Sequence, residues 1–539
     1  MKSDKFGTYG GSTPDLDSLD GLITFQNYYN GNVPDPILNP KGQSTKIIRN
    51  SVNNHAWYGL LSTFTWEMNE EWTISGGIDG RTYRGEHYGE VRDLLGGNFV
   101  WNNDNANRYL FDPLYEGDKV YYNNDAKVRW GGIFGQAEWK REAWSVFLNV
   151  TSSLSAYQRL DYFKEKDIVI DHEVFTEAIG YGDIFYYNGT DQLTYQFGDK
   201  TPYTSGDTTF VIQKKDTLYI VGAQAYTIDS KEARYTRTKW KLFPGFTVKG
   251  GANYNIDGKN NIYMNLGFLS KAPRFNNVFN NNNQEIKGAK NEIVEALEIG
   301  YNLNTKKVSL NVNGYLTYWK NRPLDSTPTY TDKQSQETYS YNVNGINAFH
   351  KGIEIEFGWK PIPSLQWDQV LSLGDWRWTS GSSAIIYGAD GDSITSFTFN
   401  AKGVHVGDAA QFQVMESIRW EIIKYLYVSG SVTLFAKNYS NMDPSTLTPQ
   451  YMDANGNPPD SWMMPVYYLV DLNAGYRFSF DKIKIDLRAS VLNLLDRVYI
   501  SDAKNNDSYS TKTTNFDANS AGVYFGIGRT FNTSLAISF

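Results

Sequence analysis

The chain has 539 residues, of which 40% are hydrophobic and 15% aromatic, and its formal net charge is −8. It contains no cysteine, which excludes disulfide scaffolds, thiol catalysis and cysteine-ligated zinc. An acidic balance without a basic stripe also argues against nucleic acid as a partner. The mean hydropathy of −0.50 and the lack of any apolar run near the roughly 18 residues of a spanning helix exclude a helical membrane protein.

Residues 1–53 are rich in turn-forming Gly, Asn and Pro, and only the stretch 22–29 has an extended pattern. We expect this segment to be loop-like, with a possible strand remnant at its start. The first twenty residues have no apolar core, so we do not expect them to form a signal peptide.

From residue 54 onward, a long run of alternating apolar and polar residues is followed by a short turn, a second long run and a long polar loop, and this scheme repeats to the end. A period of two indicates strands whose faces differ in polarity. The predicted strands are 55–67, 71–86, 127–141, 143–161, 235–254, 260–271, 293–303, 307–319, 341–360, 365–380, 409–422, 424–437, 464–480, 483–493 and 524–539.

The last stretch, 524–539, alternates most regularly. It exceeds the usual strand length of about five or six residues, whereas a tilted membrane-spanning strand needs about nine to eleven. Arg529 is its one charge on the apolar face, and we expect this residue to snorkel or to mark a local bulge. The apolar face consists of Phe525, Ile527, Phe531, Leu535, Ile537 and Phe539.

Short turns and long loops alternate strictly, which is typical of outer-membrane barrels with short periplasmic turns and long external loops. The fold class predicted from these patterns is all-β, a transmembrane antiparallel β-barrel of the bacterial outer membrane.

The loop 162–234 should be the largest external loop, opposite the turn at Asp481. Leu472, Ile485 and Leu487 should face lipid, while Asp471, Arg477, Asp486 and Arg488 should face the lumen. Because such a protein must be exported, we expect the natural chain to begin upstream of Met1.

Three motifs carry a family resemblance. They are Ala272-Pro273-Arg274-Phe275 at the start of a loop, Asn493 with Leu495, Asp496 and Tyr499 late in the chain, and the terminal aromatic Phe539. In this order they resemble the barrel of a TonB-dependent outer-membrane receptor. The segment 288–301 is similar to the return strand of that family, with Ala-Lys in place of its Pro-Glu. We expect the motif residues to be structural and to fix strand ends.

The resemblance implies a 22-stranded barrel that encloses an N-terminal plug. The chain contains about 15 of these strands and no plug, so we expect an incomplete barrel that starts near the loop before the eighth strand. Its expected parts are a loop-like segment, 1–53, and barrel strands with external loops, 54–539. The implied partners are outer-membrane lipid, the TonB complex and plug domain through the missing N-terminal part, the barrel-assembly machinery through Phe539, and a small-molecule or glycan ligand.

The implied function is TonB-dependent import of a scarce extracellular solute, whether siderophore, vitamin, peptide or glycan. The alternatives are a plug-free porin or barrel enzyme and a soluble all-β glycan-binding domain, which would show a fixed repeat period. No catalytic constellation, cofactor site or metal site is evident, and the spacing of Asp453, Asn455 and Asn457 favours a plain turn over a calcium loop. Aromatic residues in the long loops are the predicted ligand contacts, because their faces stack on sugars and flat ligands. They are Trp101, Tyr109, Phe111, Tyr115, Tyr121, Tyr122, Phe185, Tyr186, Tyr187 and Tyr195.

Overall fold

The computed structural model of the chain contains mainly strands, with one α-helix and three short 3-10 segments in its described part. Within that part, no helix is both long and apolar enough to cross a membrane. The chain divides into two compact units, which are treated separately below. Unit 1 comprises Met1–Leu60, Asp79–Gly131 and Ser155–Leu242, and unit 2 comprises Leu61–Ile78, Gly132–Leu154 and Phe243–Phe539. The structure describes residues 2–8, 19–213, 216–280, 285–286, 288–324, 329–331, 338–340, 343, 345–387, 393–407, 409–480, 483–504 and 522–539.

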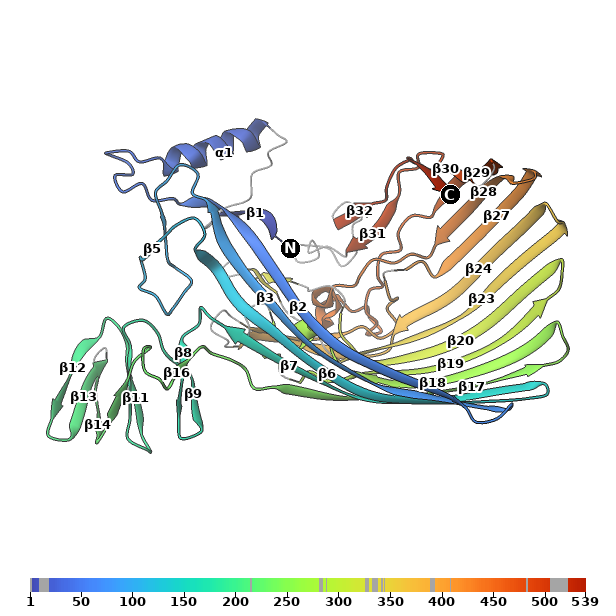
Figure 1. Ribbon diagram of the computed structural model, residues 1–539. Helices are drawn as coiled ribbons and strands as arrows, with labels where there is room; N and C mark the ends of the chain where they lie inside the picture. Colours follow the sequence, from blue (N-terminus) through green and yellow to red (C-terminus); the bar gives the residue numbers. More distant parts are fainter. Residues whose placement is uncertain are drawn as a thin grey trace. The chain divides into compact units, whose positions relative to one another are not determined.

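The described strands include one sheet of 16, in the order β1-β2-β3-β6-β7-β17-β18-β19-β20-β23-β24-β27-β28-β29-β30-β33 (Figure 1). Each predicted strand corresponds to one strand of this sheet, and β1 is additional. The bounds are β1 Lys2–Thr8, β2 Lys46–Glu67, β3 Trp72–Asp93, β6 Lys119–Arg141, β7 Trp144–Asp161, β17 Lys241–Asn255, β18 Asn260–Lys271, β19 Glu292–Asn304, β20 Val308–Arg322, β23 Ile346–Ile362, β24 Leu365–Trp378, β27 Phe412–Ile423, β28 Leu426–Ala436, β29 Tyr467–Phe480, β30 Ile483–Leu492 and β33 Thr530–Ser538.

The N-terminal segment differs from the expectation of a loop. Helix α1, Leu19–Asn32, replaces the extended stretch predicted at 22–29, and β2 begins at Lys46 rather than near residue 55. Leu22, Phe25 and Tyr29 repeat at helical spacing, a signal that the surrounding turn residues obscured. The buried Asn32 side chain then fixes the helix end by donating to the carbonyls of Lys46 at 2.6 Å and Leu94 at 3.0 Å.

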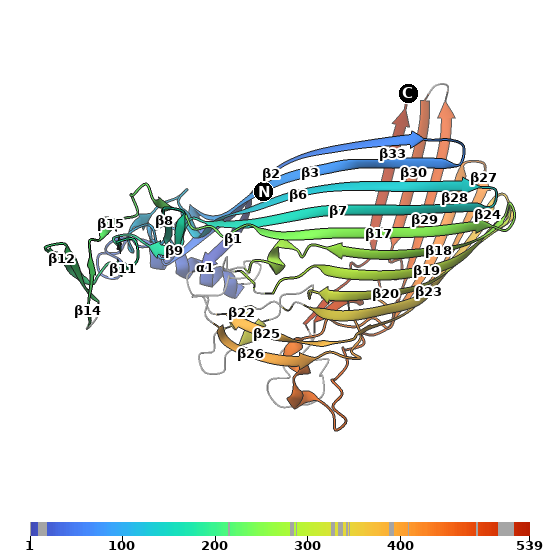
Figure 2. The ribbon, with the colours of Figure 1, turned by 90° about the horizontal axis from the view of Figure 1, so that it is seen from below.

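In unit 2, the strands of the large sheet from β17 to β30 lie side by side in antiparallel register, with β23 next to β20 and β27 next to β24 (Figure 2). Tyr476 pairs with Leu487, and Leu487 pairs with Leu535, which puts the apolar side chains of three strands on one face. Arg477 pairs with Asp486 on the opposite face, and its guanidinium donates to that carboxylate at 2.7 Å. The predicted separation of apolar from charged faces is therefore confirmed for β29 and β30, and Leu535 of β33 lies on their apolar face.

The last predicted strand is interrupted. Strand β32, Gly522–Phe525, pairs with β31, Ile500–Lys504, and β33 begins only at Thr530. Phe525 and Ile527 therefore lie outside β33, contrary to the prediction.

The order of the large sheet has β1 and β33 at its two ends in the described part of the chain, and β1 pairs only with residues 46–52 of β2. The turn expected at Asp481 lies outside the described residues.

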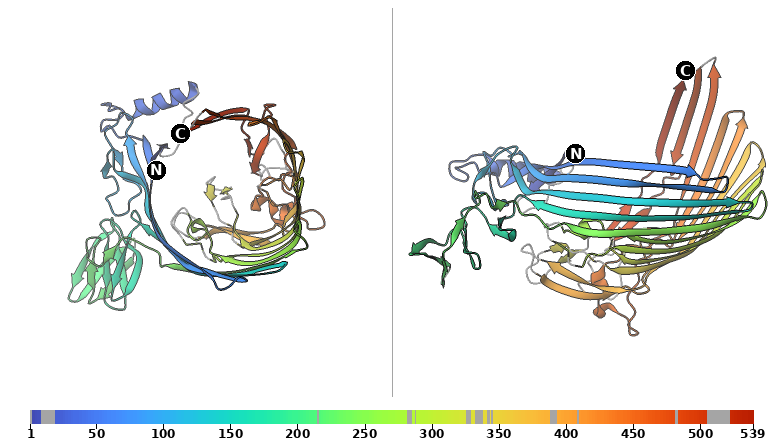
Figure 3. Two further views of the ribbon diagram at one scale, coloured as in Figure 1. Left: turned by 45° about the vertical axis from the view of Figure 1, so that its right-hand side comes forward. Right: turned by 60° about the horizontal axis from the view of Figure 1, so that its bottom comes forward.

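The long loop after β7 contains its own small sheets, seen in green beyond the ends of β6 and β7 (Figure 3). Three sheets of three strands each have the orders β16-β8-β9, β11-β10-β15 and β12-β13-β14. Buried side chains such as Ile168, Ile179 and Val211 form their cores. The strands are β8 Lys166–Ile170, β9 Glu173–Ile179, β10 Ile184–Tyr187, β11 Gln192–Tyr195, β12 Lys200–Ser205, β13 Thr208–Gln213, β14 Asp216–Val221, β15 Gln224–Tyr226 and β16 Ala233–Arg234.

The remaining short elements lie in the other connecting segments. They are β4 Val100–Trp101, β5 Pro113–Leu114, β21 Thr329–Thr331, β22 Thr338–Ser340, β25 Gly381–Tyr387, β26 Ser393–Asn400, η1 Phe275–Asn277, η2 Pro444–Leu447 and η3 Pro449–Tyr451.

Candidate ligand-binding site

Four aromatic side chains of unit 1 form an exposed cluster, which we name the aromatic platform: Tyr109, Phe111, Tyr181 and Phe197. Tyr109 is the centre, with ring centroids 5.8 Å from Tyr181, 6.1 Å from Phe197 and 6.3 Å from Phe111. The exposed fractions are 40% for Tyr109, 51% for Phe111, 42% for Tyr181 and 58% for Phe197. Large apolar groups that are clustered yet exposed mark interaction sites more often than scattered ones do.

The Asn102 side chain fixes the turn that carries Tyr109 and Phe111. It is only 2% exposed, and its Nδ2 donates to the carbonyls of Asn105 at 3.0 Å and Tyr109 at 3.1 Å. Its Oδ1 accepts from the Asn105 N–H at 3.1 Å. A buried amide that is fully hydrogen-bonded makes a turn rigid, so the exposed rings are held by a buried polar centre.

Phe111 has a φ of 78°, in the left-handed region that bulky side chains rarely adopt. Such strain persists only where the surroundings enforce it, and it concentrates at functional sites. The Phe111 ring is half-exposed, so burial of this ring in a core does not explain the left-handed backbone conformation of Phe111.

The Asp183 carboxylate fixes the second half of the platform. It accepts the Gly180 N–H at 2.7 Å and the Phe197 N–H at 2.7 Å. Gly182 has a φ of 81°, and a Cβ at this position would overlap the Phe197 ring. Only glycine therefore allows the Phe197 ring to lie this close to the backbone beside Tyr181.

Backbone hydrogen bonds join the two loops beneath the rings. The Ala106 N–H donates to the Phe163 carbonyl at 2.8 Å, and the Tyr181 N–H donates to the Ala106 carbonyl at 2.7 Å. The Asn107 side chain adds a bond to the Lys164 carbonyl at 2.7 Å. The platform is thus one preorganised surface built from two connecting segments far apart in sequence.

The cations around the platform are already engaged. Arg108 pairs with Asp112 at 3.4 Å, and Lys164 pairs with Glu177 at 2.8 Å. Lys41 lies 5.9 Å from the centroid of the Trp101 ring. An anionic ligand would have to compete with these partners.

The pKa of one carboxyl group beside the platform, that of Glu165, is raised by its surroundings. Burial raises the pKa of the Glu165 carboxyl, and the neighbouring carboxylates of Asp183 and Glu177 raise it further, against an opposing effect of Lys164. This region therefore accommodates a protonated acid more readily than additional negative charge.

The predicted loop aromatics fall into two groups. Tyr109 and Phe111 belong to the platform, and Trp101 contacts it, with its ring centroid 6.1 Å from that of Phe111. Phe185 and Tyr186 are only 2% and 8% exposed, so their prediction as ligand contacts is corrected: they are core residues of the small sheets.

The other predicted aromatics lie apart from the platform. The Tyr187 hydroxyl donates to Glu173 at 3.0 Å, and Tyr195 packs with the core of a small sheet. Tyr121 and Tyr122 have the Arg49 guanidinium 4.6 Å and 5.8 Å from their ring centroids. Tyr115 is exposed. The prediction missed Tyr181 and Phe197, although the glycines on either side of Tyr181 were a signal for an aromatic presented on a turn.

The late-chain motif joins several strand ends. Asn493 is buried, and its Nδ2 donates to the carbonyls of Arg497 at 2.9 Å and Ile527 at 3.3 Å. Asp496 accepts the Arg529 N–H at 2.9 Å and pairs with its guanidinium at 3.8 Å. Arg529 therefore lies in the break between β32 and β33, a local irregularity of the kind that its charge on the apolar face indicated.

Tyr499 and Leu495 complete this motif. The Tyr499 ring stacks on Tyr467 at 4.4 Å, and a Cβ on Gly526 would overlap it. Leu495 is 52% exposed. The contacts of Asn493, Asp496 and Tyr499 explain why the chain leaves the strand at residues 526–529.

The first motif follows β18. Its Arg274 carbonyl accepts the Asn277 N–H at 2.9 Å at the start of η1, and the Phe275 ring packs 5.1 Å from Phe279. Ala272 is half-buried and Pro273 is buried. Phe539 follows the last strand and is 95% exposed.

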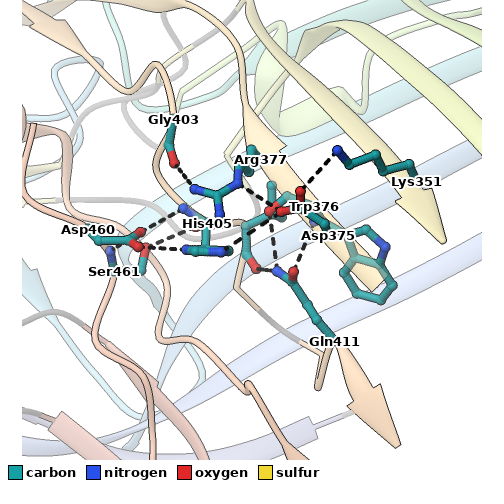
Figure 4. A network of polar contacts seen from close by, with 10 residues as sticks. Lys351, Asp375, Trp376, Arg377, Gly403, His405, Gln411, Asp460 and Ser461 are labelled. Atoms are coloured by element: carbon teal, nitrogen blue, oxygen red, sulfur yellow. Dashed lines mark hydrogen bonds and ion pairs between the residues drawn. The ribbon is translucent and has the colours of Figure 1, made fainter. Parts of the chain in front are cut away.

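A polar network in unit 2 joins the start of β23 and the end of β24 to two connecting segments (Figure 4). Asp375 accepts from Arg377 at 2.8 Å and pairs with Lys351 at 3.2 Å. Asp460 accepts the His405 N–H at 2.8 Å and contacts its Nδ1 at 2.6 Å. These charges satisfy one another, so the network fixes the loops and leaves little charge for a ligand.

No group of three or more His, Asp or Glu side chains that could hold a metal occurs among the described residues. At the calcium-like spacing, the Asp453 Oδ1 accepts the N–H groups of Asn455 and Asn457, both at 2.8 Å. Hydrogen bonds from Asn457 also lower the pKa of the Asp453 carboxyl. The segment is therefore an Asp-stabilised turn.

The long alternating strands of one antiparallel sheet define the class of a membrane β-barrel. The chain matches the family model "TonB dependent receptor-like, beta-barrel" over residues 3–494. It therefore belongs to the TonB-dependent receptor β-barrel family, whose members lie in the outer membrane, as the motifs predicted.

Solved structures show the same fold. The copper transporter OprC has a TM-score of 0.53 at 14% identity, covering 92% of this chain and 59% of its own. The ferric citrate transporter FecA has a TM-score of 0.50 at 10% identity, covering 91% and 56%. The chain thus spans less than two thirds of the length of either transporter. No curated protein sequence matches it.

Proposed function

We propose that the chain supplies the membrane wall and the ligand-capturing loops of a TonB-dependent importer. In this family, energy passed through TonB from the inner membrane displaces a plug that closes the barrel. On this proposal, the plug and the TonB contact come from polypeptide outside this chain, lipid covers the apolar strand faces, and Phe539 is read by the barrel-assembly machinery. Family membership supports the transport class, and the aromatic platform supports capture.

The choice of ligand class rests on the aromatic platform. Four preorganised rings offer apolar faces for stacking, whereas the cations nearby are held by carboxylates or a ring. Among siderophore, vitamin, peptide and glycan, this favours an uncharged solute with flat apolar faces, and a neutral glycan fits best. An anionic metal chelate would lack free cations to balance its charge.

Uptake by the full-length receptor in its host tests the proposal. Each platform ring contributes about 0.5–1.5 kcal/mol beyond area burial, so replacing all four by alanine should reduce uptake of labelled neutral oligosaccharides at least about tenfold. Tyr115→Ala is the matched control, because Tyr115 is a 53% exposed loop aromatic outside the platform. Uptake should also vanish without TonB. Unchanged uptake in the fourfold variant would refute capture by the platform, and uptake without TonB would refute the transport class.

A further inference from the structure

Two histidines of unit 1, His55 on β2 and His87 on β3, lie close together. Their ring centroids are 6.0 Å apart with an interplanar angle of 73°. Tyr83 lies beside them, stacked on His55 at 5.8 Å, and its hydroxyl is 2.7 Å from the His55 Nδ1. Two imidazoles and a phenol are thus gathered on two neighbouring strands, and the Trp57 ring lies beside the phenol at 6.1 Å.

The hydrogen bonds of His87 orient its ring as a ligand. Its Nδ1 donates to the Asn53 Oδ1 at 2.6 Å, which leaves the lone pair of a neutral imidazole on Nε2. Histidines that bind metals commonly donate their other N–H to an oxygen acceptor in this way, because the bond fixes the tautomer and the ring orientation.

Gly85 allows the groups to converge. A Cβ at this position would overlap the Tyr83 hydroxyl and would lie 2.7 Å from the His87 Nε2. Any other residue would therefore push the two groups apart. The phenol and the imidazole share the space above one glycine, and the phenol also contacts His55.

We infer that His55, Tyr83 and His87 form a binding site for a divalent first-row transition-metal ion. The His87 Nε2, the His55 Nδ1 and the Tyr83 oxygen are its ligands. On binding, the ion replaces the proton between the Tyr83 hydroxyl and His55, and that proton passes to solvent. Imidazole and phenolate donors suit such ions, with Cu²⁺ bound most tightly in the general order of affinity.

Charges of both signs act on the site. The Arg159 guanidinium acts on His87 against a cation, and the Asp125 carboxylate acts in favour of one. Arg84, on β3, is held by Asp125 at 2.9 Å and Glu86 at 3.0 Å. The His55 side chain is exposed, so an ion has access from solvent. The site is separate from the proposed solute capture and does not depend on it.

The test uses the full chain folded in detergent, with Cu²⁺ as the probe. We expect one site by titration and an electron paramagnetic resonance spectrum with two coordinated nitrogens. His55→Gln and His87→Gln should each remove one nitrogen from the spectrum, and Asn53→Ala should weaken binding about 10- to 100-fold by releasing the His87 ring.

Two control variants separate the site from adventitious binding. Asn54→Ala changes the neighbour of Asn53, whose side chain bonds Glu86 instead at 3.5 Å, and His172→Gln removes an exposed loop histidine. Both should bind Cu²⁺ like the wild type, and the electrophoretic shift of the folded barrel identifies variants that fold. Tyr83→Phe, which keeps the ring, should weaken binding without removing a nitrogen. The inference is overturned if the wild type binds no Cu²⁺, if folded His55 or His87 variants keep both nitrogens, or if the controls lose binding equally.

Discussion

Replacing Asn102 by alanine should loosen the aromatic platform while the barrel strands remain intact. The change removes four hydrogen bonds of the buried amide, those to the Asn105 carbonyl and N–H, to the Tyr109 carbonyl and, at 3.4 Å, to the Arg108 carbonyl. At about 0.5–1.5 kcal/mol for each bond, the turn should lose about 3 kcal/mol. This corresponds to an open form populated about 100-fold more.

Amide hydrogen exchange measures that opening directly. The Phe111 and Asp112 N–H groups, which bond the carbonyls of Asn102 and Tyr109 at 3.3 Å and 3.0 Å, should exchange about 100-fold faster. Asn103→Ala is the control, because this exposed neighbour should change the rates less than about twofold. Equal exchange in the two variants would refute the view that Asn102 fixes the platform.

Three further predictions follow from other parts of the structure. Gly182→Ala should cost about 1–2 kcal/mol in the left-handed region and displace the Phe197 ring, seen as faster exchange of the Phe197 amide. The folded loop raises the pKa of Glu165, so the protonated carboxyl favours the folded loop at low pH, and this contribution is lost as pH rises through that pKa. Proteolysis of the loop should therefore be slower at about pH 5 than at about pH 7.5. Glu165→Gln should remove the difference. Leu472→Arg should cost about 2–4 kcal/mol at mid-depth and reduce assembled barrel far more than Asn473→Arg, whereas equal losses would contradict the facing.

The strands were predictable because the period-two pattern is both long and local. Strand β18 has the predicted bounds, and most others differ by a few residues. The break before β33 was indicated only by the charge of Arg529 on the apolar face, because Gly526 and Gly528 fit the alternation. Only their contact with the Asn493 motif, about thirty residues earlier in the chain, takes the segment out of the strand.

The site was only partly predictable. Aromatic content identified Tyr109 and Phe111, but it could not separate them from Phe185, because burial in the loop depends on which of its short strands pair. The sequence analysis did not pair His55 with His87, although the short turn between the predicted strands 55–67 and 71–86 puts the two residues at similar distances from it on adjacent strands. Counting residues from that turn would have indicated their proximity.

Equilibrium binding to the folded chain tests the central claim, capture of an uncharged solute by the aromatic platform, most directly. Neutral oligosaccharides and anionic ferric chelates would be titrated in parallel against the wild type, the fourfold alanine variant of the platform and Tyr115→Ala. We predict saturable binding of a neutral oligosaccharide to the wild type and to Tyr115→Ala, with a loss of at least about tenfold in the fourfold variant. Preferential binding of a ferric chelate, or oligosaccharide binding that survives in the fourfold variant, would contradict the account.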